Sequence, residues 1–209
     1  NISITRLGAS YVGGLRNGEI IGKFSQSGMV FDMNMTTGEV KFIRTQNPMP
    51  PFPYKTEEVT FTNPSDKALF SGTLTYPVGY EKMNKKTVPV VLMITGSGQE
   101  NRDEEVFQHK PFLVIADYLA RNGVATLRYD DRGVGSSKGD VKELTTIVNM
   151  EDAMAGLTYL KQLNKFGKIG ALGHSEGGTI TFMLASRGKV DFIISMAGTG
   201  VKGDSVISE

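Results

Sequence analysis

The sequence contains no cysteine. The chain therefore has no disulfide bonds, no thiolate metal site and no cysteine nucleophile. An excess of charge is also missing, because the formal net charge is +1 at pH 7 and no basic cluster occurs, so no nucleic-acid partner is expected. The longest apolar run, residues 88–94, is far too short to cross a bilayer, and no signal-peptide pattern is visible. These absences exclude several classes of protein but do not fix the compartment.

What is present is the composition of an ordinary globular protein. Of the 209 residues, 39% are hydrophobic and 22% are charged, which suits one large domain or one domain with a small partner. The first five residues already alternate as in a strand, and the chain ends on a polar stretch with no closing element. We therefore expect the sequence to be a piece of a longer protein.

Residues 1–43 carry β signals. Asn17-Gly18 separates two short apolar stretches, which is the strongest short-range signal of a hairpin, and apolar residues alternate along residues 29–35. This pattern favours a structural β unit without chemistry, with a lipid or sugar site as the alternative. Half of the chain's 8 prolines then fall within residues 48–53, a stiff run through which no element continues. We expect a partial antiparallel β domain, a proline-rich linker and a main domain at residues 1–47, 48–54 and 55–209.

The main domain alternates strand and helix signals. Strands are predicted at residues 59–61, 70–76, 88–94, 124–129, 168–172 and 192–196. Helices are predicted from Pro111 to about Gly123, around residues 147–160, and after residue 175. Alternation from residue 88 onward predicts an α/β fold with a doubly wound, mostly parallel sheet that is covered on both faces.

The most informative motif is Gly-His-Ser-Glu-Gly at residues 173–177. It has the form G-x-S-x-G and stands between a predicted buried strand and a predicted helix. This is the setting of a nucleophile elbow, whose small residues allow a tight turn that exposes the serine hydroxyl. A purely structural Gly/Ser turn is the alternative, and the flanking elements favour the catalytic interpretation.

Two further loops follow parallel strands directly. Residues 95–104 follow the strand at 88–94, and residues 130–139 follow the strand at 124–129. Because open α/β sheets place their sites at the carboxyl ends of the strands, we expect both loops to meet the elbow there.

With these motifs in the same order, residues 55–200 resemble the α/β-hydrolase superfamily. Thr-Gly-Ser-Gly at residues 95–98 occupies the position of the oxyanion loop, and residues 131–137 match the D-x-R-G-x-G-x-S loop inexactly. The runs Asn-Arg-Asp-Glu at 101–104 and His-Lys-Pro-Phe at 109–112 are similar to one branch, bacterial esterases with a β-rich N-terminal domain. The resemblance implies an incomplete α/β-hydrolase fold and leaves a periplasmic or secreted location open.

The resemblance implies roles for individual residues. Ser175 becomes the nucleophile, the N–H of Glu176 becomes one oxyanion donor, and the N–H of Ser97 or Gln99 becomes the other. Removal of one such donor typically costs about 2.7–4 kcal/mol of transition-state stabilisation. The glycines have an alternative explanation, since tight turns need them whatever the chemistry.

The base and acid of the expected triad are harder to find. The order in the family is serine, acid, histidine, but both histidines, His109 and His174, precede Ser175. We expect the His174 side chain to point away from Ser175, and His109 to cap the following helix or to contact substrate. Of the later acids, Asp191 precedes the last strand, at the wrong end of the sheet, and Asp204 comes too early in the fold. The resemblance therefore predicts that the acid and base lie beyond Glu209.

The loop charges allow two interpretations: they bind an anionic substrate, or they pair with each other and brace the loops, which is the commoner use. They are Arg102, Asp103, Asp130, Asp131 and Arg132.

The function expected from the resemblance is a serine hydrolase acting on small-molecule carboxylic esters, without cofactor or metal. Thioesterase or aminopeptidase chemistry on the same fold, and a non-catalytic ligand-binding protein, are the alternatives.

Overall fold

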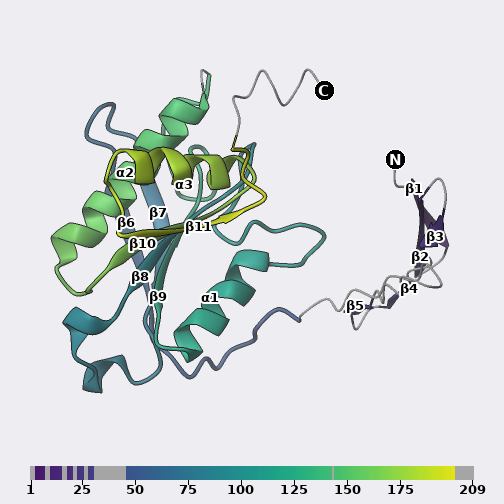
Figure 1. Ribbon diagram of the computed structural model, residues 1–209, viewed down its shortest axis with the longest axis horizontal. Coiled ribbons are helices and arrows are strands. Elements are labelled where there is room, and N and C mark those ends of the chain that lie inside the picture. The colour runs from purple at the N-terminus through teal and green to yellow at the C-terminus, as the bar shows by residue number, and fades with distance from the viewer. Residues whose placement is uncertain are drawn as a thin grey trace. The chain divides into compact units, whose positions relative to one another are not determined.

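The computed structural model describes residues 46–142 and 144–200, together with the backbone of five short strands between residues 3 and 30 (Figure 1). The chain divides into two compact units, Asn1–Asn47 and Pro48–Glu209. Each is described by itself.

The first unit contains two small antiparallel sheets. One has the order β1-β2-β3 and the other pairs β4 with β5. The strands are β1 (Ser3–Leu7), β2 (Ser10–Leu15), β3 (Gly18–Ile20), β4 (Lys23–Ser25) and β5 (Gly28–Val30). Leu15 pairs with Gly18, so the hairpin closes one residue earlier than Asn17-Gly18 predicts. The predicted strands after residue 30 lie outside the described residues.

The second unit is built on a six-stranded sheet with the order β11-β10-β8-β9-β7-β6. Its strands are β6 (Thr56–Thr62), β7 (Leu69–Thr75), β8 (Val90–Ile94), β9 (Ala125–Tyr129), β10 (Ile169–His174) and β11 (Phe192–Met196). The strands from β8 to β11 pair in parallel, whereas β7 is antiparallel to both β9 and β6. The predicted α/β class and mostly parallel sheet are confirmed, and the β6–β7 hairpin forms an antiparallel margin.

Helices cover both faces of this sheet, as a doubly wound fold requires. In Figure 1, α1 (Pro111–Arg121) lies on one side, and α2 (Thr146–Leu163) and α3 (Glu176–Ser186) lie on the other. Strand β8 explains the arrangement, because its side chains alternate between two cores. Val90, Leu92 and Ile94 belong to the core that includes residues of α2 and α3, whereas Val91 and Met93 join the smaller core of α1.

The ends of the helices follow local rules. Helix α1 has Pro111 at its first turn, where the missing N–H costs nothing, and Gly123 follows its C-cap with a φ of 84°. At the start of α2, the Thr145 hydroxyl accepts a hydrogen bond from the N–H of Val148. Two short 3-10 helices, Tyr80–Lys82 and Lys85–Thr87, precede β8. Among the helices described, none is long and apolar enough to span a membrane.

Candidate active site

Ser175 lies in a sharp turn between the end of β10 and the start of α3. Its φ of 51° is rare for a residue other than glycine and costs of order 1–3 kcal/mol. The two glycines of the motif have no space for a side chain. A Cβ on Gly173 would lie 2.1 Å from the carbonyl oxygen of Gly177, and one on Gly177 would lie 2.2 Å from that of Ile94. The strained serine and its crowded glycines are the geometry of a nucleophile elbow.

The N–H of Ser175 has a hydrogen-bond partner, whereas that of Glu176 has none among the described residues. The Ser175 N–H donates to the carbonyl of Met196 at 2.9 Å, which fixes the elbow to the end of β11. The N–H of Glu176 belongs to the first turn of α3, where N–H groups lack partners within the helix. The Glu176 side chain accepts a hydrogen bond from Thr146 of α2 at 2.6 Å. In residues 46–142 and 144–200, the Ser175 hydroxyl makes no hydrogen bond.

The loop after β8 passes directly beside the elbow. A Cβ on Gly96 would lie 3.4 Å from the Cβ of Ser175. Ser97 and Gln99 follow on the same loop with exposed side chains, separated by Gly98 with a φ of 114°. The Gln99 side chain donates to the carbonyl of Arg132 at 2.8 Å and so connects this loop to the next one. Gly96 brings the backbone of the loop against the serine.

The loop after β9 is bound to the same place through Asp131. Its carboxylate accepts hydrogen bonds from the Thr95 hydroxyl at 3.0 Å and from the N–H of Glu100 at 2.9 Å. Burial raises the pKa of Asp131 to about 7, and the nearby charges of Glu100 and Asp152 add to this despite the hydrogen bonds. The three loops expected at this edge of the sheet are therefore in contact.

The two histidines have different surroundings. The Nδ1 of His174 lies 2.7 Å from an oxygen of Glu104, and the described residues contain no hydrogen bond between His174 and Ser175. His109 pairs through its backbone with Val106 in a tight hairpin. The N-cap of α1 is Lys110, so His109 does not occupy the capping position.

A family model and several curated proteins are similar to this chain in sequence. The model of the serine aminopeptidase family S33 matches residues 110–201. Esterase EstD of Thermotoga maritima is 32% identical over 127 residues, which cover 60% of this chain and 29% of that protein. An acyl transferase of Photobacterium leiognathi is 28% identical over 116 residues, or 55% of this chain and 35% of that protein.

Solved structures share the fold. An esterase of Pyrococcus furiosus, Pf2001, superimposes with a TM-score of 0.57 at 20% identity, over 74% of this chain and 57% of that one. Est1E of Butyrivibrio proteoclasticus, solved with ferulic acid, gives a TM-score of 0.53 at 26% identity, over 67% and 52%. The chain has, in its second unit, the α/β-hydrolase fold. It spans roughly a third of the curated relatives that it matches.

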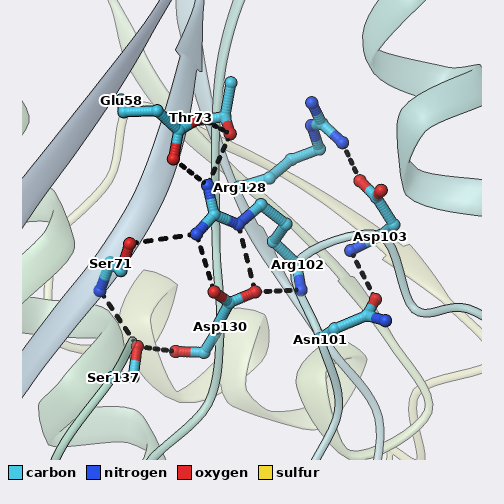
Figure 2. Close-up of polar contacts among 9 residues, drawn as sticks. All are labelled: Glu58, Ser71, Thr73, Asn101, Arg102, Asp103, Arg128, Asp130 and Ser137. Carbon is cyan, nitrogen blue, oxygen red and sulfur yellow. Dashed lines mark hydrogen bonds and ion pairs between the residues drawn. The ribbon is translucent and has the colours of Figure 1, made fainter. Parts of the chain in front are cut away.

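In the second unit, an arginine anchors the loop after β8 to the antiparallel edge of the sheet (Figure 2). The Arg102 guanidinium binds both oxygens of Asp130, at 3.0 and 2.6 Å, and donates to Glu58, Thr73 and Ser71. Burial lowers the pKa of Arg102, but the hydrogen bonds to Asp130 and Glu58 outweigh it and raise the pKa above its usual range. We name this group the Arg102 clamp.

The other loop charges of the second unit are paired in the same way. Arg128 is buried and pairs with Asp103, and burial lowers the pKa of its guanidinium. Arg132 binds both oxygens of Asp152 on α2 at 2.6 Å and also contacts Asp66. The structure thus agrees with the bracing interpretation of these charges rather than with an anionic substrate.

Three acids follow Glu176 in the sequence. Asp191 accepts a hydrogen bond from the N–H of Ile169 at 2.7 Å, at the start of β10, so it lies at the opposite end of the sheet from Ser175. Asp204 and Glu209 lie outside the described residues.

The residues that sequence reasoning missed are buried polar groups. Asp152 lies on α2, a helix that was predicted from the spacing of its apolar residues alone. The side-chain amide of Asn63, 89 residues away in the sequence, donates a hydrogen bond to its carboxylate. Glu104 lies in the loop between β8 and α1, and its neighbours in the sequence gave no signal of its burial. A small hollow lies between the loop after β8 and α2, and Thr95, Gly96, Asp131 and Asn149 are among its lining residues.

Proposed function

We propose that this α/β-hydrolase is a serine esterase and that Ser175 forms an acyl-enzyme with carboxylic esters. The observation that carries the proposal is the backbone of Ser175, held at positive φ between two glycines that have no room for a side chain. Such strain persists where the surrounding structure enforces it, commonly at a reactive residue.

In the proposed reaction, the Ser175 oxygen bonds to the carbonyl carbon of the ester, and the carbonyl electrons move to its oxygen. The N–H of Glu176 and that of Ser97 or Gln99 would bind this oxyanion. The positive end of α3 adds to the same position. Collapse expels the alcohol with the serine proton, and water then hydrolyses the acyl ester. His109, near the loop, is a candidate substrate contact.

We infer that the acid and base of the triad lie in a segment after Glu209. The sequence contains no histidine after Ser175, and the family order places the base last. Consistent with this, the match covers 29% of the Thermotoga maritima esterase. Aminopeptidase chemistry on the same acyl-enzyme is the second candidate, because the matching family model is that of a serine aminopeptidase family.

The test is covalent labelling in the full-length protein. A fluorophosphonate probe should label the wild type and the Ser186→Ala control, whose serine lies at the far end of α3, but not Ser175→Ala. Labelling that survives Ser175→Ala would exclude Ser175 as the nucleophile. A folded wild type that no probe labels would favour the non-catalytic binding protein.

Turnover separates the remaining possibilities. Esters and aminoacyl amides of matched size, compared by kcat/KM, distinguish the esterase from the aminopeptidase.

The 209-residue chain alone should hydrolyse p-nitrophenyl esters poorly. Only the background rate that substrate binding and the oxyanion donors supply without a base should remain. Full activity of this chain would place the base within it, with His109 the first residue to replace.

A further inference from the structure

Glu104 is a buried acid in the loop that connects β8 to α1. Its residue is only 7% exposed, and its φ of 50° is unfavourable for a residue that is not glycine. One oxygen, Oε1, serves two partners. It accepts a hydrogen bond from the N–H of Gly96 at 2.8 Å, and it lies 2.7 Å from Nδ1 of His174. A single carboxylate oxygen thus joins the start of the loop to the elbow.

Gly96 shows how close this junction lies to the serine. A Cβ placed on Gly96 would lie 3.2 Å from Oε1 of Glu104, 3.4 Å from Cβ of Ser175 and 3.5 Å from Nδ1 of His174. The backbone that Glu104 holds is therefore the backbone that passes the reacting residue. Ser97 and Gln99, whose N–H groups are the candidate oxyanion donors, follow within three residues.

The loop after β8 is attached to the sheet by contacts that do not involve Glu104. The Arg102 clamp, with the N–H of Arg102 donating to Asp130 at 2.9 Å, already fixes the middle of the loop to the far side of the sheet. Glu104 contacts the other side, toward β10 and α3. Its two hydrogen bonds set the position of the loop relative to Ser175.

We propose that Glu104 is a positioning residue, whose carboxylate holds the backbone of residues 96–99 against the elbow and keeps His174 in the tautomer that carries its proton on Nδ1. The proposal rests on the proposed function of Ser175. The oxyanion donors gain their effect from being fixed before the charge develops, so a loop free to shift loses transition-state stabilisation with little change in substrate binding.

The first arm of the test is spectroscopic and needs no activity. It is carried out on the full-length protein, in which the ring nitrogens of His174 are assigned as the signals that a His174→Gln variant lacks. We expect the Nδ1–H tautomer and a protected Gly96 amide in the wild type and in Glu104→Gln, which keeps an oxygen acceptor. In Glu104→Gly, which tolerates positive φ, the Gly96 amide should exchange about 10- to 100-fold faster, the loss expected for a hydrogen bond to a charged group.

The second arm is the rate of fluorophosphonate labelling and of ester turnover in the full-length protein. Glu104→Gln should stay within a few-fold of the wild type, whereas Glu104→Gly should lose about 10- to 100-fold in kcat with KM nearly unchanged. Glu105→Gly is the matched control, because this neighbouring acid is exposed and pairs with Lys110 at 3.6 Å. Should Glu104→Gly not fold, Glu104→Asn replaces it, since asparagine tolerates positive φ and is one methylene too short.

The outcomes separate the two proposals. A wild type that is not labelled at Ser175 overturns the proposed function, and the spectroscopic arm then decides alone whether Glu104 holds the loop. Unchanged Gly96 exchange and an unchanged His174 tautomer in the folded Gly or Asn variant would overturn the role of Glu104. So would an equal loss of kcat in Glu105→Gly, because the effect would not be specific to the elbow contact.

Discussion

The residue types around Ser175 are determined by the lack of space for side chains more than by charge. Gly173 and Gly177 contact backbone carbonyls where a methyl group would overlap them, and Gly178 meets Gly198 and Ser195 in the same way. This crowding pushes the serine into a conformation that its own side chain does not favour. The glycines of the motif are therefore required by the fold, whether or not the serine reacts, and only a test of the hydroxyl separates the two explanations.

Asp131 gives a prediction about pH at the same scale. Its pKa in the folded state is about 7 against a usual value of 3.8, so the folded protein disfavours the carboxylate. The resulting loss of folding stability is absent below about pH 4, because Asp131 is then protonated in both the folded and the unfolded state. It grows as the pH rises toward 7 and stays constant above that. Asp131→Asn keeps an oxygen acceptor for Thr95 and Glu100 and removes the charge.

We therefore expect the free energy of unfolding of Asp131→Asn to exceed that of the wild type by an amount that rises between pH 4 and pH 7, to roughly 2–4 kcal/mol. Urea unfolding at pH 4.5, 6 and 8 measures it. A difference that does not change with pH, or that falls as pH rises, would contradict the prediction.

Among the elements, the Arg102 clamp joins a loop, two strands and the end of a third. Its side chain is 17% exposed and donates to five acceptor atoms from four residues. Lysine carries one compact charge in place of the planar guanidinium, so it can replace only some of these contacts.

Arg102→Met should lower the free energy of unfolding by about 3–5 kcal/mol, since it leaves Asp130 buried without its partner. Arg102→Lys should recover only part of this. The control is Arg121→Met, whose exposed pair with Asp117 lies on the surface of α1 and should change stability little. Urea unfolding measures all three. Equal losses in Arg102→Met and Arg121→Met would show that the clamp contributes no more than a surface pair.

The sequence predicted elements better than it predicted contacts. Strand β11 runs from Phe192 to Met196 as expected. A short apolar run that follows a helix, in a chain that alternates strands and helices, is expected to be a buried strand. The antiparallel pairing of β7 with β9 could not be predicted, because the residue pattern of a strand does not reveal the direction of its partner. Asp152 and Glu104 could not be found, since a charged residue on a helix or loop looks exposed until its distant partner, such as Asn63, is known.

At the scale of the whole molecule, residues 1–47 form a compact unit of their own. We predict that this unit contributes little to acyl transfer, because it contains no histidine and its acids alternate with apolar residues as in a sheet with one wet face. Deletion of residues 1–47 from the full-length protein should leave kcat/KM for a small ester within a few-fold. A thousand-fold loss, with circular dichroism showing that the rest is folded, would mean that the unit helps to build the active site.

The two margins of the six-stranded sheet differ in a way that affects assembly. Strand β6 carries Glu57 and Glu58, and charged side chains on an outer strand discourage further pairing. At the other edge, β11 pairs only with β10 among the strands that the structure describes, and it is partly exposed, with Ile194 at 41%. An apolar outer strand is a template on which one more strand can be added. A further strand would therefore add to this sheet more readily beside β11 than beside β6.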